Sequence, residues 1–266
     1  MERAEVGVFG GSGFYKFLED IREIKVDTPY GAPSDKIAVG TLAGRRVAFL
    51  PRHGKDHQYP PHMINFRANV WALSNLGVTR VIGPCTCGSL QPHIKPGDFV
   101  FCDQFVDRTW GRKDTFYDGP VTTHLPMAEP YCSEMRKLAL GKAGELGIPH
   151  HPTGTIVVIQ GPRFSTKAES RWFSRMGWDV VSMTQYPEAV LAKELGMCYV
   201  NVALVTDYDA GLEGRPDIEA VTHDEVIRVF NENVDNLKAL ITAVIQEIPE
   251  TCACRCAEIV KQSRMG

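Results

Sequence analysis

Residues 180–211 read VVSMTQYPEAVLAKELGMCYVNVALVTDYDAG. The order of residue types predicts a strand, a polar turn, a helix, a second strand and a second polar turn. Residues 199–205 are β-rich and almost wholly apolar, which is typical of a strand covered on both faces. Two predicted strands therefore end in polar clusters, at residues 182–188 and 206–211. Ligands bind beyond such strand ends in open α/β sheets, although two ordinary capped loops would give the same pattern.

Three further predicted strands end in residues that suit an anion. Residues 6–9 run into GGSG at 10–13, residues 46–50 into PRHG at 51–54, and residues 80–83 into PCTC at 84–87. Glycines and a serine present N–H and O–H donors, and Arg52 offers a bidentate fork. A tight turn or a solvated basic turn would explain each cluster alone. Together with GPRFS at 161–165, the clusters favour a site for an anion and a small polar molecule.

The composition is that of an ordinary folded protein. The 266 residues are 44% hydrophobic and 23% charged, with a net charge of −3. These values do not favour disorder or an electrostatic nucleic-acid binder. No run of about 18 apolar residues predicts a membrane span, and the charged first residues do not resemble a secretory signal. We therefore expect a cytoplasmic protein without nucleic-acid or membrane partners.

The rest of the chain continues the α/β pattern without an internal repeat or a linker. Further strands are predicted at residues 97–105, 154–160 and 178–181, and helices at 65–76, 130–146, 168–175, 189–195 and 222–248. The fold class is therefore α/β, with a central mixed twisted sheet of seven to nine strands flanked by helices. We predict a single domain over residues 1–250, followed by a Cys-rich tail at 251–266.

Eight cysteines fall into two groups. Five lie in or beside apolar segments, where cysteine packs as a small hydrophobe: Cys85, Cys87, Cys102, Cys132 and Cys198. The pair in PCTC lacks C-x₂-C spacing and a second ligand pair, so it does not predict a metal site. The other three, Cys252, Cys254 and Cys256, are expected beyond the core. They could form an inert tail, a redox-active pair or a weak metal site, and a reducing cytosol argues against a permanent disulfide.

Taken in order, these motifs resemble the trimeric purine nucleoside phosphorylase family, and within it the 5′-methylthioadenosine phosphorylase branch. The resemblance covers residues 5–248 and includes GGSG at 10–13, PRHG at 51–54, GSL at 88–90, GPRFS at 161–165, MT at 183–184 and TDYD at 206–209. It implies that inorganic phosphate attacks the anomeric carbon of a purine nucleoside, releasing free base and a ribose 1-phosphate. It also implies a homotrimer acting in purine salvage, with phosphate as co-substrate and with neither cofactor nor metal.

The resemblance also assigns site residues. The implied phosphate ligands are Ser12, Arg52, His53, Cys85, Thr86 and Thr184. Cys85 and Thr86 would act through their backbone, because Cys85 stands where many relatives carry a hydroxyl residue. The implied nucleoside-binding residues are Met183 at the ribose, Phe164 and Ser165 at the purine and sugar, and His57 and His124 lining the site. His124 would reach the site across a subunit boundary.

Asp207 and Asp209 are the candidate catalytic residues of this reaction. A purine leaves poorly as an anion, so a donor to N7 is needed, and a buried carboxyl beside a second carboxylate can hold a proton near neutrality. We assign Asp207 as that donor and Asp209 as the acceptor for an exocyclic amine. Branches that act on 6-oxopurines usually carry asparagine in place of Asp207, so the sequence predicts adenine as the base.

The 5′ side of the nucleoside is assigned to His223 and Ile227. Methylthioadenosine phosphorylases usually carry a small apolar residue where His223 falls, whereas relatives acting on ordinary nucleosides tend to have histidine. A partly exposed histidine at a helix start would explain the residue equally well. The predicted activity is phosphorolysis of 5′-methylthioadenosine to adenine and 5-methylthioribose 1-phosphate. The alternative is a broader purine nucleoside phosphorylase that accepts 5′-hydroxyl nucleosides such as adenosine, inosine or guanosine.

Overall fold

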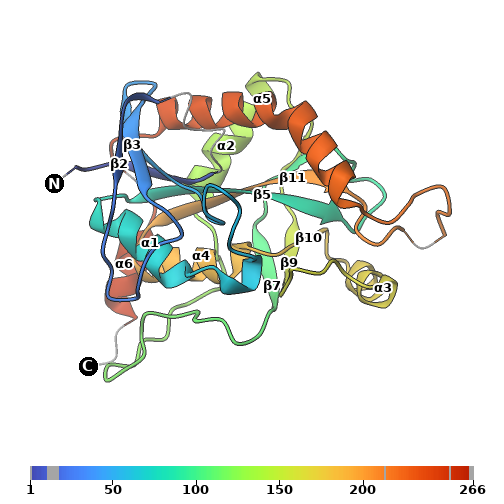
Figure 1. Cartoon of the computed structure of the whole chain (residues 1–266), viewed down its shortest axis with the longest axis horizontal. Helices are drawn as coiled ribbons and strands as arrows, with labels where there is room; N and C mark the ends of the chain where they lie inside the picture. Colours follow the sequence, from blue (N-terminus) through green and yellow to red (C-terminus); the bar gives the residue numbers. More distant parts are fainter. Residues whose placement is uncertain (1, 11–17, 213, 252, 264–266) are drawn as a thin grey trace.

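The structure, a computed structural model, describes residues 2–10, 18–212, 214–251 and 253–263. Its centre is β11 (Cys198–Asp207), a strand in which every residue is buried. Figure 1 shows β11 beside β5 (Arg80–Ser89), with which it pairs in parallel, and its other edge pairs with β6 (Phe99–Val100). The prediction that this apolar run is covered on both faces is confirmed.

The sheet is mixed and contains eleven strands among the described residues, more than the seven to nine predicted. Its order is β2-β3-β4-β1-β5-β10-β9-β7, with β11, β6 and β8 branching from β5. The remaining strands are β1 (Val6–Phe9), β2 (Glu19–Ile24), β3 (Ile37–Leu42), β4 (Arg45–Leu50), β7 (Gln104–Arg108), β8 (His150–His151), β9 (Thr155–Ile159) and β10 (Val180–Ser182). One predicted strand, at residues 97–105, is wrong, because β6 and β7 replace it and pair with different neighbours.

Helices cover both faces of the sheet, as the fold class predicts. Figure 1 shows α2 (Ser133–Glu145) and α5 (His223–Glu247) on one face, and α1 (Phe66–Asn75) and α4 (Gln185–Glu194) on the other. β11 contributes side chains to both buried layers, because alternate side chains of a strand point to opposite faces. Val200 packs in the cluster with α2 and α5, whereas Ala203 packs with α1 and α4. The sheet is therefore the middle layer of three.

The strand β5 corrects the prediction that this segment ends at Gly83 and continues as a loop. Pro84 lies inside the strand, because β11 pairs with β5 from Arg80 to Gly88. On the other edge, β1 pairs only with residues 80–82 and β10 only with residues 88–89. Pro84 cannot donate a hydrogen bond, and this gap between β1 and β10 requires none from it. The gap leaves one edge of a central strand without a partner among the described strands.

The C-terminal segment corrects the expectation of a tail beyond the core. It forms the helix α6 (Cys256–Gln262), which lies against α4. Cys254 and Cys256 pack against the buried cluster that contains Cys132 and Cys198. Cys252 lies outside the described residues, and the domain division at residue 250 stays a prediction. None of the described helices has the length and apolar character that a membrane crossing requires.

Candidate active site

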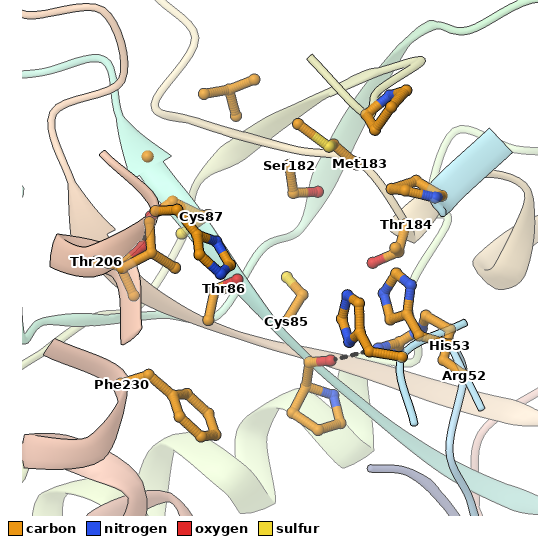
Figure 2. A pocket seen from close by; sticks show the side chains of 18 of the residues that line it. Arg52, His53, Cys85, Thr86, Cys87, Ser182, Met183, Thr184, Thr206 and Phe230 are labelled. Carbon is orange, nitrogen blue, oxygen red and sulfur yellow. Dashed lines mark hydrogen bonds between the residues drawn. The ribbon is translucent and has the colours of Figure 1, made fainter. Parts of the chain in front are cut away.

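A cavity of about 830 Å³ lies where β4, β5, β10 and β11 end. Figure 2 shows β5 residues on one side of it, residues 182–184 on another, and Arg52 and His53 beside them. The first turns of α5 close the remaining wall. Twelve of the predicted site residues line the cavity: Arg52, His53, His57, Cys85, Thr86, Phe164, Met183, Thr184, Asp207, Asp209, His223 and Ile227. The polar strand ends that the sequence singles out therefore do meet.

The gap in the sheet gives this cavity a wall of backbone. Cys85 and Thr86 lie on β5 between the points where β1 and β10 pair with it. Backbone polar groups of a strand point alternately to its two edges. The carbonyl of Pro84 faces the gap, where Arg52 Nη1 donates to it at 3.0 Å. The N–H of Thr86, two residues further on, faces the same gap and is suited to an anion.

The thiol of Cys85 does not repel an anion bound against this wall. Asn201 Nδ2 donates to its sulfur at 3.4 Å. Burial raises the pKa of Cys85, against the opposing effects of the Asn201 hydrogen bond and Arg52. The group is therefore neutral at physiological pH, and it brings no negative charge to the place where the resemblance puts phosphate.

Arg52 forms a buried ion pair that the sequence did not predict. Its Nε and Nη2 atoms each donate to a carboxylate oxygen of Glu188 at 2.7 Å. Glu188 is fully buried, and the hydroxyl of Tyr199 lies 2.5 Å from its Oε1. Burial lowers the pKa of Arg52, but the Glu188 carboxylate outweighs burial and raises it overall. The guanidinium is thus held rigidly, and only the second hydrogens on Nη1 and Nη2 remain for a ligand.

His53 faces the cavity as a neutral ring. Its Nδ1 lies 2.8 Å from the carbonyl oxygen of Tyr59, and its ring stacks on His57 with centroids 4.3 Å apart. Burial, opposed by the Tyr59 hydrogen bond and assisted by Arg52 and His57, lowers the pKa of His53 to about 4. Because a neutral ring bonded through Nδ1–H has an acceptor at Nε2, this histidine suits a protonated phosphate oxygen.

Asp207 and Asp209 lie at the buried end of β11, as predicted. The Asp207 carboxylate accepts from Thr206 Oγ1 and from the Asp209 backbone N–H, both at 2.7 Å. Burial nevertheless raises the pKa of Asp207 to about 6, and the neighbouring Asp209 and Glu225 charges add to this effect. Asp207 can therefore hold a proton close to neutrality. A pKa of this kind is the one a general acid requires.

Asp209 presents an acceptor. Its Oδ2 atom is buried and has no hydrogen-bond partner among the described residues. Burial raises the pKa of Asp209, although the hydroxyls of Ser170 and Ser165 oppose the effect. A buried carboxylate oxygen left without a partner is costly, so a donor from a ligand would stabilise it. The exocyclic amine of adenine is such a donor.

The opposite wall of the cavity is mainly apolar. It comes from α5, through Val226, Ile227, Phe230 and Leu237, and His223 stands at the first helical position. Thr222 caps the helix, because its Oγ1 accepts from the backbone N–H of Glu225 at 3.3 Å. His223 and Ile227 thus line the same cavity, as predicted. Their roles at the 5′ side of the nucleoside stay predictions.

Two predicted site residues, Ser165 and His124, do not line the cavity, and a third is not described. Ser12 is outside the described residues, although the neighbouring Gly10 lines the cavity. Ser165 is half-buried next to Asp209 but does not line the cavity. His124 is exposed on the loop after β7, where its backbone N–H donates to Ser263 O at 3.3 Å. In a single chain it does not reach the cavity.

Sequence reasoning missed several residues of the site. Ser182, Thr206 and Phe230 line the cavity and are labelled in Figure 2. The hydroxyl of Ser182 is buried without a hydrogen-bond partner among the described residues, so it is also available to a ligand. Ser182 and Thr206 belong to the polar clusters at residues 182–188 and 206–211. Treating every hydroxyl in those clusters as a candidate ligand would have identified both. Phe230 is one residue of a long apolar stripe, which contained no such signal.

Comparisons with known proteins agree with this geometry. Residues 5–246 match the model of the Phosphorylase superfamily. An S-methyl-5′-thioadenosine phosphorylase from Thermofilum pendens is 49% identical, covering 99% of both chains. A purine nucleoside phosphorylase from Streptomyces coelicolor is also 49% identical, covering 96% of this chain and 94% of its own.

A solved structure shares the fold over the whole chain. Methylthioadenosine phosphorylase from Schistosoma mansoni in complex with adenine matches with a TM-score of 0.91 and 36% identity, covering 98% of this chain and 99% of that one. The mixed sheet with helices on both faces is thus the phosphorylase architecture. The chain therefore belongs to the phosphorylase superfamily, and within it to the 5′-methylthioadenosine phosphorylase branch that its motifs resemble.

Proposed function

We propose that this chain catalyses the phosphorolysis of 5′-methylthioadenosine to adenine and 5-methylthioribose 1-phosphate. The observation that carries the proposal is the position of Asp207. Its carboxyl, with a pKa raised to about 6, shares one cavity with the anion-suited wall of β5 and the apolar wall of α5. This shared cavity supports a proton donor, a phosphate site and a pocket for an alkylthio group lying close together.

The proposed reaction begins with phosphate against the gap in the sheet. The backbone of Thr86, the hydroxyl of Thr184 and the remaining N–H groups of Arg52 would hold it. A phosphate oxygen forms a bond to the anomeric carbon as the bond to purine N9 breaks. The electron pair of that bond goes to the purine, and the phosphate charge stabilises the developing oxocarbenium ion. Positioned donors of this kind contribute several kcal/mol at the transition state.

The departing base receives its proton from Asp207 at N7, so that neutral adenine leaves. Asp209 Oδ2, which is buried without a partner among the described residues, would accept from the exocyclic amine. An ionised carboxylate placed there would instead repel the O6 atom of a 6-oxopurine. The acid pair therefore supports adenine rather than hypoxanthine or guanine as the base.

A kinetic comparison tests the proposal. Methylthioadenosine, adenosine and inosine are assayed with phosphate present and absent, and kcat/KM is compared. We expect turnover only with phosphate, and methylthioadenosine as the best substrate. Inosine as the best substrate would contradict the role of Asp207, and turnover without phosphate would indicate a hydrolase.

One observation favours a second candidate, a broader purine nucleoside phosphorylase. His223 lines the cavity at the start of α5, where it can contact a 5′-hydroxyl group. The His223→Ala variant is expected to raise the ratio of kcat/KM for methylthioadenosine to that for adenosine. The apolar residue one turn later serves as the matched variant, because Ile227→Ala should lower the same ratio. An unchanged ratio in His223→Ala would show that the residue does not face the 5′ group.

The oligomer and the location belong to the same proposal. His124 is exposed and outside the cavity of its own chain, so a neighbouring subunit would have to supply it. This position supports the homotrimer that the family resemblance implies. We place the enzyme in the cytoplasm, with a nucleoside and phosphate as its small-molecule partners.

A further inference from the structure

Four cysteine sulfurs gather at the end of the molecule opposite to the active site. They belong to Cys132, Cys198, Cys254 and Cys256, and all of them lie within 4.8 Å of one another. Cys132 immediately precedes α2, Cys198 begins β11, and the other two come from the C-terminal segment. Residues from three distant parts of the chain thus converge on one point.

We infer that these four cysteines form a structural site for one thiolate-bound Zn²⁺ ion. Zinc in structural sites is held by four ligands in a tetrahedron with Zn–S distances of about 2.3 Å. Such a tetrahedron places its sulfurs about 3.8 Å apart. The sulfurs of Cys198 and Cys254 are 3.2 Å apart and no pair exceeds 4.8 Å, so the cluster reaches this geometry with shifts of about 1 Å.

The surroundings of the cluster suit a closed metal site. Cys132 and Cys198 are buried, Cys254 and Cys256 are half-buried, and all four pack with the apolar core under α2 and α5. The apolar core excludes water from the side of the cluster that Cys132 and Cys198 form, which suits a structural site.

A cation balances the negative charge that four thiolates would bring. Lys193 is buried on α4, which packs against α6, the helix that begins at Cys256. Lys193 Nζ also donates to the backbone carbonyl of Glu129. The ammonium is therefore fixed beside the cluster, where it offsets part of the net charge of a metal with four thiolates.

The position of the cluster indicates a structural role. Cys198 and Asp207 are the first and last residues of β11, which at about 3.3 Å per residue separates them by about 30 Å. The metal would not touch the substrate. It would join α6 to the first residue of the central strand and to the start of α2. The inference does not depend on the proposed activity.

Metal uptake by the full chain tests this inference. The protein is reduced under anaerobic conditions and titrated with Co²⁺, which replaces Zn²⁺ at such sites and reports tetrahedral thiolate ligation by sulfur-to-cobalt charge-transfer bands. We expect one Co²⁺ per chain, displaced by Zn²⁺, together with a higher Tm when Zn²⁺ is bound. The C254S/C256S variant should bind at least about tenfold more weakly. The C102A variant, which removes a buried cysteine outside the cluster, should bind like the parent protein.

A second measurement identifies the ligands without a variant. Alkylation of the reduced protein, followed by mass spectrometry, should show Zn²⁺-dependent protection of the four cluster cysteines but not of Cys87. Absence of uptake by the reduced parent protein, or equal uptake by C254S/C256S, would overturn the site. Conversion of the four thiols to two disulfides in air, with no metal bound after reduction, would overturn it too.

Discussion

At the scale of single residues, Asp207 is set by two opposed effects. Burial favours its protonated form, whereas the hydrogen bonds from Thr206 and Asp209 favour the carboxylate. Burial prevails, and the resulting pKa of about 6 lies close to the pH at which the group would work. The side chain is thus able both to keep a proton in the empty site and to give it up to a departing base.

The pH dependence of the reaction should report this proton. Because protonated Asp207 is the proposed proton donor, kcat/KM for methylthioadenosine should fall as pH rises above about 6. In Asp207→Asn the falling limb should disappear and kcat should drop at least about 100-fold. The measurement is a pH–rate profile of both proteins at saturating phosphate. A falling limb that persists in the variant would assign it to another group.

The raised pKa of Asp207 also lowers the stability of the folded protein. Because the pKa of Asp207 is raised from 3.8 to about 6 on folding, the folded state binds more protons and stability falls as pH rises through that range. Well above pH 6 the raised pKa lowers the free energy of unfolding by its full amount, about 3 kcal/mol. We expect Asp207→Asn to gain stability over the parent protein by up to about this amount between pH 4 and pH 8.

Urea unfolding at several pH values measures this effect, and Asp217→Asn is the control. Hydrogen bonds from Arg215 lower the pKa of the exposed Asp217, so its contribution has the opposite sign. That stability is present at neutral pH and is lost as pH falls through the lowered pKa. If the free energy of unfolding of Asp207→Asn varied with pH in the same way as that of the parent protein, the raised pKa of Asp207 would not be its cause.

At the scale of secondary-structure elements, the first turn of α5 positions the apolar wall of the site. Thr222 caps this helix, and residues of the next two turns line the cavity. Thr222→Ala removes the side-chain acceptor for Glu225 N–H and should destabilise the helix start by about 1 kcal/mol. We expect a higher KM for the nucleoside with little change in kcat. Thr222→Ser keeps the acceptor and should restore the KM of the parent protein.

The sequence predicts elements well where local pattern and packing agree. The strand–helix–strand unit of β10, α4 and β11 and the long helix α5 follow from apolar spacing and from stop residues such as Gly196. The prediction fails for β5, because Pro84 is read locally as a strand breaker. Only the gap between β1 and β10 makes that proline acceptable, and this gap is a property of the assembled sheet.

The same limit applies to the site. Residues at strand ends were found because the carboxyl edge of a sheet gathers them in any α/β fold. The ion pair of Arg52 and Glu188 was not found, because its partners are 136 positions apart and no local pattern indicates that they pair. The cysteine cluster was missed for the same reason, since Cys198 and Cys254 are 56 positions apart.

At the scale of the whole molecule, one edge of the sheet exposes large apolar side chains. Trp110, Trp172 and Met176 are 73%, 44% and 57% exposed, and the two tryptophans line a second cavity of about 450 Å³. Figure 1 shows α3 (Lys167–Arg175), which carries Trp172, projecting from the body of the molecule. In a protein that forms an oligomer, exposed apolar side chains of this kind are candidates for the subunit interface.

This surface predicts where the proposed trimer forms. Trp172→Asp places a charge in it and should convert a trimer to monomers, as measured by light scattering coupled to gel filtration. The matched control is Leu146→Asp, because Leu146 after α2 is also 44% exposed. A trimer that survives Trp172→Asp but not Leu146→Asp would place the interface elsewhere.

The gap beside β5 gives a bound anion a second role. Between residues 82 and 88 one edge of a central strand is left open by β1 and β10. An anion bound there supplies the acceptor atoms that a neighbouring strand would otherwise supply. In that sense it completes the sheet, and it would do so at the point where Arg52 already bridges to Pro84. Phosphate at its proposed position would then be both the co-substrate and a partner for the open edge of β5.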